Sequence, residues 1–303
     1  MAAQQHFDVI IIGGSYSGLS AAMALGRALR KVLVIDSGKP CNAQTPHSHN
    51  FLTRDGATPQ ALSRIAREEV AQYATVQFIS DLAVSGSSIQ EGFSIQTKTG
   101  QDFTAGKLLF ATGVADQMPD IPGFADCWGI SLIHCPYCHG YEVRHQKTGI
   151  IANGPIAFEF AKMILNWTSQ LTLLTNGPSP LNEEEAKVLQ ERGVEIVETK
   201  IKAIDHNKGQ VQQLVLDDGK ALPFNAIYAK IPFHQHCSIP EQLGCLLTEQ
   251  GLLQIDTMQQ TTVPGIYASG DNTTMMRAVS AAVASGAFAG AAINRALIEA
   301  DFA

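Results

Sequence analysis

The stretch Phe7-Asp-Val-Ile-Ile-Ile-Gly13-Gly14-Ser15-Tyr16-Ser17-Gly18 decides the fold of this chain. Its continuous apolar run predicts a strand buried on both faces of a parallel sheet. Glycines follow at once, and a run rich in Ala and Leu through Leu29 predicts a helix. A second apolar run, Val32 to Ile35, predicts the next strand and ends at Asp36. The stretch therefore predicts a βαβ unit with glycines at its first turn.

Glycines at such a turn, with an acid about 20 residues further on, are the fingerprint of dinucleotide binding. The glycines allow a tight turn, a close approach to a pyrophosphate and close helix packing, and the helix N-terminus offers N–H groups to the phosphates. Ser15 replaces the middle glycine, but it is small and can still present its N–H. A glycine-rich turn in an unrelated α/β fold is the alternative. The candidate binding residues here are Gly13, Gly14, Ser15, Tyr16, Ser17, Gly18, Asp36 and Ser37.

The order of elements recurs later in the chain. In the first copy, residues 89–113 predict short strands around a turn at Thr99-Gly100. The second copy has a strand, a glycine turn, a helix, a strand, a hairpin around Asp218-Gly219 and a last strand. Its segments are Gly149–Ala152, Gly154, Ala157–Leu165, Leu171–Leu174 and Ala226–Lys230. The sequence therefore predicts two copies of one βαβ-plus-hairpin module.

A third signal lies near the C-terminus, where Thr261 to Ala268 predicts a strand that runs into Gly270-Asp271, followed by a helix from about Arg277. Since the second copy ends near residue 240, this segment returns most naturally to the first module. We therefore expect an α/β fold of two Rossmann-like, three-layer ββα nucleotide-binding domains, the second inserted in the first. The expected boundaries are 1–116 with 241–303 for the first domain and 117–240 for the second.

One short run, His134-Cys135-Pro136-Tyr137-Cys138-His139-Gly140, carries the remaining chemistry. Two cysteines at this spacing can open and close a disulfide, often with one thiolate available near neutral pH. The run also fits a zinc ligand pair, a c-type haem attachment site, a glutaredoxin dithiol and a structural disulfide. No second Cys/His pair at similar spacing accompanies it, so we expect no metal site. Only its context favours a redox role.

Composition sets the class of protein. The chain has 303 residues, 45% of them hydrophobic, and a net charge of −7, which predicts about two domains and disfavours nucleic acid and anionic membranes as partners. The N-terminus has no basic leader, and the apolar run Ala278–Ile293 with Gly286-x-x-x-Gly290 favours a buried helix over a membrane span. We expect a soluble, cytoplasmic protein. Its other cysteines, expected to be buried, are Cys41, Cys127, Cys237 and Cys245.

Taken together, the motifs resemble those of the low-molecular-weight thioredoxin reductases in order and spacing, over essentially the whole chain. The resemblance implies that the first module binds FAD and the second NAD(P)H, and that the chain forms a homodimer. It also implies that Cys138 faces the flavin, while Cys135 exchanges with a disulfide or dithiol substrate, either a small protein such as thioredoxin or a small molecule. The motifs are Gly13-x-Ser15-x-x-Gly18, Ala111-Thr112-Gly113, Cys135-x-x-Cys138 and Gly270-Asp271.

The same resemblance assigns further roles in the flavin site. Asp271 would hold the ribityl chain, and Arg277 and Ala278 would lie at the pyrimidine edge, where negative charge gathers on reduction. His139 stands where thioredoxin reductases carry Asp, and histidine titrates near neutral pH. We therefore expect His139 to be the acid or base for the exchanging thiols. His134 has a weaker claim, and we expect the loop with His47 and His49 to be solvated.

The second module departs from the family pattern, so NAD(P)H remains uncertain. Its turn reads Ala152-Asn153-Gly154-Pro155-Ile156-Ala157, and Thr175-Asn176-Gly177 replaces the His-Arg-Arg cluster that grips a 2′-phosphate. No Lys or Arg occurs between Lys162 and Lys187. A weakened NADPH site, a reductase with another electron donor, and a dithiol oxidase that uses O2 all stay open. The Cys-Pro-Tyr-Cys-His-Gly-Tyr-Glu run looks more like the dithiol oxidases. A redox-sensing flavoprotein is the alternative from another class.

Overall fold

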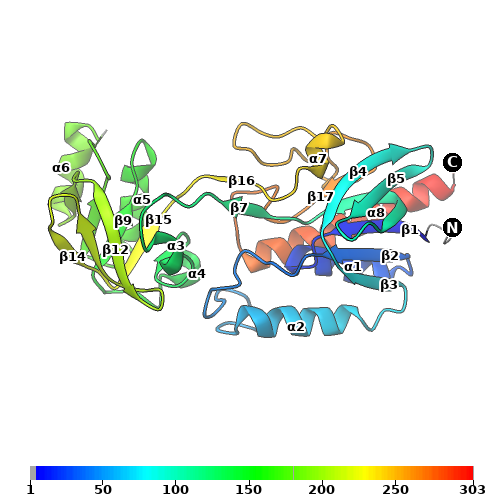
Figure 1. Cartoon of the computed structure of the whole chain (residues 1–303), viewed down its shortest axis with the longest axis horizontal. Coiled ribbons are helices and arrows are strands. Elements are labelled where there is room, and N and C mark those ends of the chain that lie inside the picture. Colours follow the sequence, from blue (N-terminus) through cyan, green and yellow to red (C-terminus); the bar gives the residue numbers. More distant parts are fainter. Residues whose placement is uncertain (1–4, 180, 303) are drawn as a thin grey trace. The chain divides into compact units, whose positions relative to one another are not determined.

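The computed structural model describes residues 5–179 and 181–302, so residues 1–4 and 303 of the expected first domain and residue 180 of the expected second domain lie outside the described residues. The chain forms two compact units (Figure 1). Unit 1 contains residues 1–43, 51–115 and 233–303, and unit 2 contains residues 44–50 and 116–232. The expected boundaries were 116/117 and 240/241. The compact units divide at 115/116 and 232/233, and they place residues 44–50 with the later segment.

Unit 1 is built on a seven-stranded sheet in the order β3-β2-β1-β6-β5-β4, with β17 also paired to β6. The pairs among β3, β2, β1, β6 and β17 are parallel, whereas β4, β5 and β6 are antiparallel. The strands are β1 (Gln5–Ile12), β2 (Val32–Asp36), β3 (Val76–Ser80), β4 (Ala83–Ile89), β5 (Gly92–Thr97), β6 (Asp102–Phe110) and β17 (Ile266–Ala268). The helices are α1 (Tyr16–Arg27), α2 (Pro59–Val70), α7 (Ile239–Gln242) and α8 (Val279–Asp301).

The side chains of β1 point alternately to the two faces of the sheet, and each face carries its own layer of unit 1. Val9 and Ile11 point into a buried cluster with side chains of α1, α2 and α8. Ile10 and Ile12 point to the opposite face, where they pack with Ile95 of β5 and residues of the later segment. Because successive side chains of a strand face opposite sides, one apolar run covers both faces of the sheet. The predicted mixed α/β fold with parallel sheets is confirmed.

The long apolar helix α8 packs closely on α1. A Cβ at Gly286 would collide with the carbonyl oxygen of Ser17, and a Cβ at Gly290 would lie 2.8 Å from the carbonyl oxygen of Ala21. The Ser20 hydroxyl also donates to the carbonyl of Val283 at 2.8 Å. By length and composition alone α8 could cross a membrane. Its two glycines, however, serve a helix contact within unit 1.

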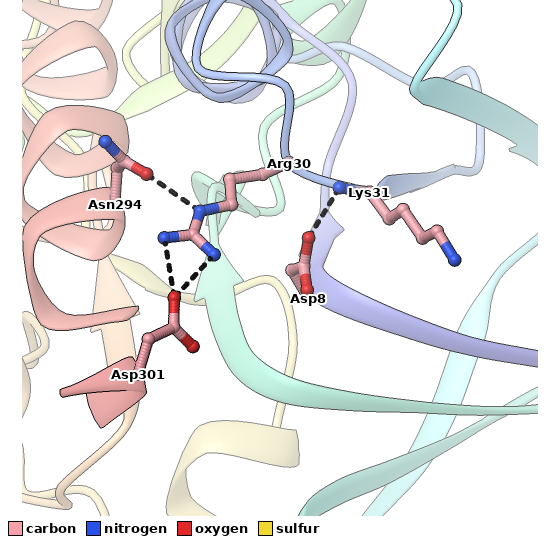
Figure 2. A network of polar contacts seen from close by, with 5 residues as sticks. All are labelled: Asp8, Arg30, Lys31, Asn294 and Asp301. Carbon is pink, nitrogen blue, oxygen red and sulfur yellow. Dashed lines mark hydrogen bonds and ion pairs between the residues drawn. The ribbon is translucent and has the colours of Figure 1, made fainter. Parts of the chain in front are cut away.

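Arg30 ties the loop after α1 to the end of α8 (Figure 2). Its Nε donates to the Asn294 side chain at 2.9 Å, and both of its terminal nitrogens lie 3.3 Å from Asp301. In the same loop, the backbone N–H of Lys31 donates to the carboxylate of Asp8 at 2.7 Å. These contacts fix the α1–β2 connection and therefore the place where β2 begins.

Unit 2 repeats the parallel-sheet arrangement in the order β11-β10-β9-β15-β8, and a separate antiparallel sheet is formed by β12-β13-β14. A further pair, β7 (Val114–Asp116) with β16 (Phe233–Gln235), forms where the chain leaves and re-enters unit 1. The strands of unit 2 are β8 (Leu132–Ile133), β9 (Thr148–Ile151), β10 (Leu171–Leu174), β11 (Glu195–Val197), β12 (Ile201–Asn207), β13 (Gln210–Leu216), β14 (Ala221–Pro223) and β15 (Ala226–Ala229). Its helices are α3 (Phe124–Cys127), α4 (Pro136–His139), α5 (Ile156–Ile164) and α6 (Glu183–Glu191).

Two buried clusters cover the faces of the unit 2 sheet. On one face, Ile150 and Leu173 pack with Phe160 of α5 and Leu189 of α6. On the other face, the hairpin β12–β13 packs with α3 and with Leu132, Leu174 and Ile227 of the sheet strands. The sheet of unit 2 is thus covered by helices on one side and by antiparallel strands on the other, as expected for a second copy of the module.

Candidate functional site

The glycine turn of unit 1 connects β1 to α1 and lies beside the end of β2. Gly13 has φ of 104°, and a Cβ there would collide with the carbonyl of Ala111. A Cβ at Gly14 would lie 2.8 Å from the Cβ of Asp36, which is the last residue of β2. Both positions therefore require glycine, one for its backbone conformation and one for space. Ser37 follows Asp36 and is exposed.

The first turn of α1 is open to an anion. Ser15 is the N-cap, its side chain makes no cap hydrogen bond, and the first helical turn contains no acidic residue. Tyr16 begins the helix, and Gly18 packs directly against the carbonyl of Gly13. Because a helix N-terminus carries N–H groups and a partial positive charge, this turn suits the pyrophosphate of a dinucleotide.

The second element of the site is the segment after β6. The N–H of Ala111 donates to the carbonyl of Ile12 at 2.8 Å, which places Ala111 beside the end of β1. Thr112 and Gly113 follow, and the amide of Asn272 donates to the carbonyl of Phe110 at 2.9 Å. Asn272 is fully buried, and its Oδ1 has no hydrogen-bond partner among the described residues. An acceptor is therefore open beside Thr112, where a hydroxyl or N–H of a bound cofactor could satisfy it.

The third element follows β17. Gly270 has φ of 90°, and its N–H donates to the hydroxyl of Ser285 at 3.1 Å. The carboxylate of Asp271 lies 3.7 Å from Nε of Arg277, and both side chains are mostly buried. Helix α8 begins at Val279, so Arg277 lies before the helix and Ala278 is its N-cap. The expected start at Arg277 is thus two residues too early, because these residues are still part of the loop.

These segments come together because their strands are neighbours. β2, β1, β6 and β17 are adjacent and parallel, so their carboxyl ends lie at one edge of the sheet. Dinucleotides bind at such edges in open α/β sheets. The open helix terminus, the carboxylate of Asp36 beside Gly14 and the open acceptor of Asn272 together fit FAD. The assignment of individual contacts to FAD stays a prediction.

The disulfide site belongs to unit 2. Cys135 and Cys138 form a disulfide across one helical turn, with their Cα atoms 5.3 Å apart. Pro136 begins the short helix α4, and the N–H groups of Cys138 and His139 both donate to the carbonyl of Cys135 at 3.2 Å. Both cysteines are half-buried. The turn therefore holds the two sulfurs at bonding distance while it leaves them partly accessible.

His139 directly follows Cys138 in the chain, and its ring contacts a second histidine. Its ring and that of His49 meet edge to face with centroids 6.3 Å apart. Burial lowers the pKa of His139 below its ordinary value, the charge of His49 lowers it further, and Glu142 opposes both effects. A lowered pKa favours the neutral imidazole, which can accept a proton from a thiol.

The other histidines near the motif have different surroundings. His134 stacks on Trp128 with centroids 5.8 Å apart, and the indole N–H of Trp128 donates to Asp116 at 3.1 Å. His47 is exposed, whereas the side chain of His49 is only 20% exposed. The expectation of a solvated loop is therefore wrong for His49, because this residue packs in unit 2 against His139.

The turn after β9 is hydrogen-bonded to the loop after β10 through the side chain of Asn153. The amide of Asn153 donates to the carbonyl of Thr175 at 2.9 Å and to that of Pro178 at 3.4 Å, and its Oδ1 accepts the N–H of Gly154 at 2.7 Å. The hydroxyl of Thr175 donates to the carbonyl of Gly177 at 2.6 Å. Asn153 therefore bridges the two loops between which a dinucleotide would bind, and it uses a backbone N–H that would face the phosphates.

The four remaining cysteines take no part in a disulfide within the described part of the chain. Cys127 and Cys245 are buried and Cys237 is half-buried, but Cys41 is exposed, so the expectation that all four are buried is wrong for Cys41. Cys41 lies in a turn between β2 and α2, where the chain offers no core to enter. Within residues 5–179 and 181–302, no group of three or more metal-ligating side chains is placed to hold a metal ion.

Comparisons with known proteins agree with this architecture. The model of the pyridine nucleotide-disulphide oxidoreductase family matches residues 7–286. The chain is 31% identical to thioredoxin reductase tcpT of Claviceps purpurea over 96% of this chain and 94% of the relative. It is 32% identical to thioredoxin reductase aclD of Aspergillus oryzae over 93% and 94% of the two chains. A crystal structure of an oxidoreductase from Agrobacterium tumefaciens matches with a TM-score of 0.91 and 36% identity, over 97% of this chain and 99% of that one.

The family match spans both the glycine turn of unit 1 and the disulfide of unit 2, and the two relatives align over nearly their whole length. FAD is the cofactor of this family, so the cofactor expected from the sequence is confirmed at that level. The chain belongs to the pyridine nucleotide-disulphide oxidoreductase family and is an oxidoreductase of the thioredoxin reductase type.

Proposed function

We propose that the protein is an FAD-dependent thiol–disulfide oxidoreductase, which moves an electron pair between FAD, the Cys135–Cys138 disulfide and a dithiol or disulfide substrate. The observation that supports this most strongly is the half-buried Cys135–Cys138 disulfide, which His139 follows directly in the chain as a possible acid or base. A structural disulfide needs no acid or base next to it, whereas thiol–disulfide exchange depends on a thiolate.

The exchange step can be written for a dithiol substrate. One substrate thiol gives its proton to His139, and its sulfur attacks Sγ of Cys135, so that the bond from Cys135 to Cys138 breaks and Cys138 leaves as a thiolate. The sulfur of the second substrate thiol then attacks the first substrate sulfur, the bond from that sulfur to Cys135 breaks, and Cys135 leaves as a thiol with the proton of the second substrate thiol, which releases the oxidised substrate. The substrate loses two electrons and the cysteine pair gains them, and the same steps run backward for a disulfide substrate. FAD, when bound, supplies the second two-electron carrier.

For unit 1 we propose the FAD contacts that the resemblance implies. The N-terminal turn of α1, from Gly13 to Gly18, binds the pyrophosphate, and Asp36 accepts the ribose hydroxyls of the adenosine. Asp271 holds the ribityl chain. Arg277 stands close to Asp271 and places a cation where the reduced flavin gathers negative charge. Ser37, Ala111, Thr112, Gly113, Gly270 and Ala278 line the same edge of the sheet.

A second candidate function is a dithiol oxidase that passes its electrons to O2. Asn153 favours it, because its side chain bridges the loops where a nicotinamide dinucleotide would bind. The sequence also offers no Lys or Arg between Lys162 and Lys187 to pair with a 2′-phosphate. On this proposal electrons enter through the disulfide from a substrate dithiol and leave the flavin to oxygen, and unit 2 serves as the carrier of the disulfide.

One experiment separates these functions. The FAD-loaded protein is mixed anaerobically with NADPH, NADH or dithiothreitol, and the flavin absorbance is followed. We expect dithiothreitol to bleach the flavin rapidly, and we expect peroxide to form when air is admitted. Rapid bleaching by NADPH or NADH would instead support a nicotinamide-fed reductase. Bleaching and reoxidation without sustained turnover would support a redox sensor.

The protein is proposed to act as a cytoplasmic homodimer, without nucleic acid or membrane partners, on a small protein such as thioredoxin or on a small dithiol. Light scattering on the FAD-loaded protein measures the oligomeric state directly. Turnover with thioredoxin and with a small cyclic disulfide, compared at equal concentration, distinguishes the two classes of substrate.

A further inference from the structure

The segment that carries His49 is anchored to the disulfide-bearing unit. Residues 44–50 belong to unit 2, although most of the surrounding N-terminal chain belongs to unit 1. The side-chain amide of Gln44 donates to the carbonyl of Trp128 at 2.5 Å. Gly129 packs so closely on this segment that a Cβ there would lie 3.1 Å from the hydroxyl of Thr45. Thr45 and Ser48 are both buried. The segment is therefore held in place before any substrate binds.

This anchoring brings three titratable side chains together. Nε2 of His49 lies 3.6 Å from Oε1 of Glu142, and the ring of His49 stands edge to face against that of His139. His139 and Glu142 both follow the second cysteine of the motif, so they are fixed to the disulfide by a few residues of chain. The contact with Glu142 restrains the ring of His49 and thereby the surface that this ring offers to His139.

The charges around His139 act in opposite directions. Burial lowers its pKa most, the positive charge of His49 lowers it further, and the carboxylate of Glu142 raises it. The ring of His47 lies next to His49, with centroids 6.3 Å apart, and does not contribute to the shift at His139. The Cys135–Cys138 disulfide, which immediately precedes His139 in the chain, is uncharged until it is reduced.

We propose that His49, oriented by Glu142, is a positioning residue for His139, and that these three side chains form one proton-exchange unit for the thiols of Cys135 and Cys138. The inference rests on the proposed thiol–disulfide exchange, in which His139 takes the proton of the attacking thiol. The ring of His49 meets that of His139 edge to face, and the positive charge of His49 opposes protonation of His139, so the proton is held weakly and passes on to the leaving thiolate. The proton moves from one sulfur to another, and none is consumed.

The test compares His49→Asn and Glu142→Gln with a matched histidine substitution, His145→Asn, at an exposed position in the same unit. Histidine-labelled protein loaded with FAD is titrated by NMR, and the His139 resonance is assigned with His139→Gln. Loss of His49 removes a positive charge, so the pKa of His139 should rise. Loss of Glu142 removes a negative charge, so the pKa of His139 should fall. The control should leave it unchanged.

The rate of flavin bleaching by dithiothreitol, measured against pH, gives the second readout. The acid limb of this profile should move to higher pH in His49→Asn, with a severalfold loss of rate on the acid side, and to lower pH in Glu142→Gln. The proposal would be overturned if the acid limbs of both variants moved in the same direction. It would also be overturned if the limbs stayed in place and only the maximal rate was lower. The NMR titration does not need turnover, so a failure of the proposed function is seen separately, as an absence of bleaching.

Discussion

The hydroxyl oxygens of Ser17 and Ser269 lie 2.7 Å apart, although 252 residues separate them in the chain. Both side chains are buried. Ser17 is in the first turn of α1, directly after the glycine turn, and Ser269 precedes Gly270-Asp271. This hydrogen bond therefore joins the two ends of the chain that unit 1 combines into one proposed FAD site.

Ser269→Ala should destabilise the protein, because it leaves the buried hydroxyl of Ser17 without its partner. An unsatisfied buried hydroxyl costs about 1 to 3 kcal/mol. Urea unfolding of the FAD-loaded protein measures the change in the free energy of unfolding. Ser88→Ala, at an exposed position in β4, is the matched control and should unfold like the wild type. Equal unfolding midpoints for both variants would show that the Ser17–Ser269 bond does not stabilise the unit.

Gly14→Ala should abolish or strongly weaken FAD retention. The new Cβ would lie 2.8 Å from the Cβ of Asp36, so either the turn or the carboxylate must move. The ratio of flavin to protein absorbance after purification reports the loss. Gly106→Ala is the control, since its nearest contact would be an ordinary 3.5 Å. A Gly14→Ala protein as yellow as the wild type would contradict the proposed approach of the cofactor to this turn.

Much of the fold was predictable because the signals are local. The apolar run before Gly13 and the strand Leu171–Leu174 needed only their own residues to be recognised, and the structure places strands at both. The residue at which a helix begins depends on contacts with more distant parts of the chain. Arg277 and Ala278 look like the start of α8 in the sequence, yet they lie in a loop because Arg277 contacts Asp271 instead of entering the helix.

Alkylation with iodoacetamide at neutral pH should label Cys41 first in the oxidised protein. Burial raises the pKa of the Cys127, Cys237 and Cys245 thiols, so little of each is present as the reactive thiolate. Reduction with a dithiol should add Cys135 and Cys138 to the labelled set. Mass spectrometry of peptides locates each label. Labelling of Cys237 as fast as Cys41, or of Cys138 without reduction, would be inconsistent with the structure.

Acidification should destabilise the wild type partly through His139. The pKa of His139 is lowered in the folded state. Below about pH 6.5, His139 of the unfolded chain therefore binds a proton that His139 of the folded protein does not yet bind. This part of the stability is lost as the pH falls from there through the lowered folded pKa. Urea midpoints measured across this range should fall less steeply in His139→Gln than in the wild type. Equal slopes of urea midpoint against pH for the two proteins would argue against a lowered pKa of His139.

The proposed site was less predictable than the fold because its contacts cross the sequence. His49 lies 90 residues before His139, and only the anchoring of Gln44 to the loop at Trp128 brings them together. The turn with Ala152 was recognised as a departure from the family pattern, but the bridge from Asn153 to the loop after β10 was missed, because it depends on the folded distance between two turns. Asn272 was missed although it follows Gly270-Asp271, because burial of an amide side chain cannot be read from a loop sequence.

The central claim is that the flavin and the Cys135–Cys138 disulfide share one electron pair during turnover. The most direct measurement is an anaerobic reductive titration of FAD-loaded wild type and Cys138→Ser, followed by turnover of both with a dithiol. The account predicts that the wild type takes up twice as many reducing equivalents as Cys138→Ser, which should remain yellow and fail to turn over. Equal uptake by the two proteins, or wild-type turnover by Cys138→Ser, would contradict it.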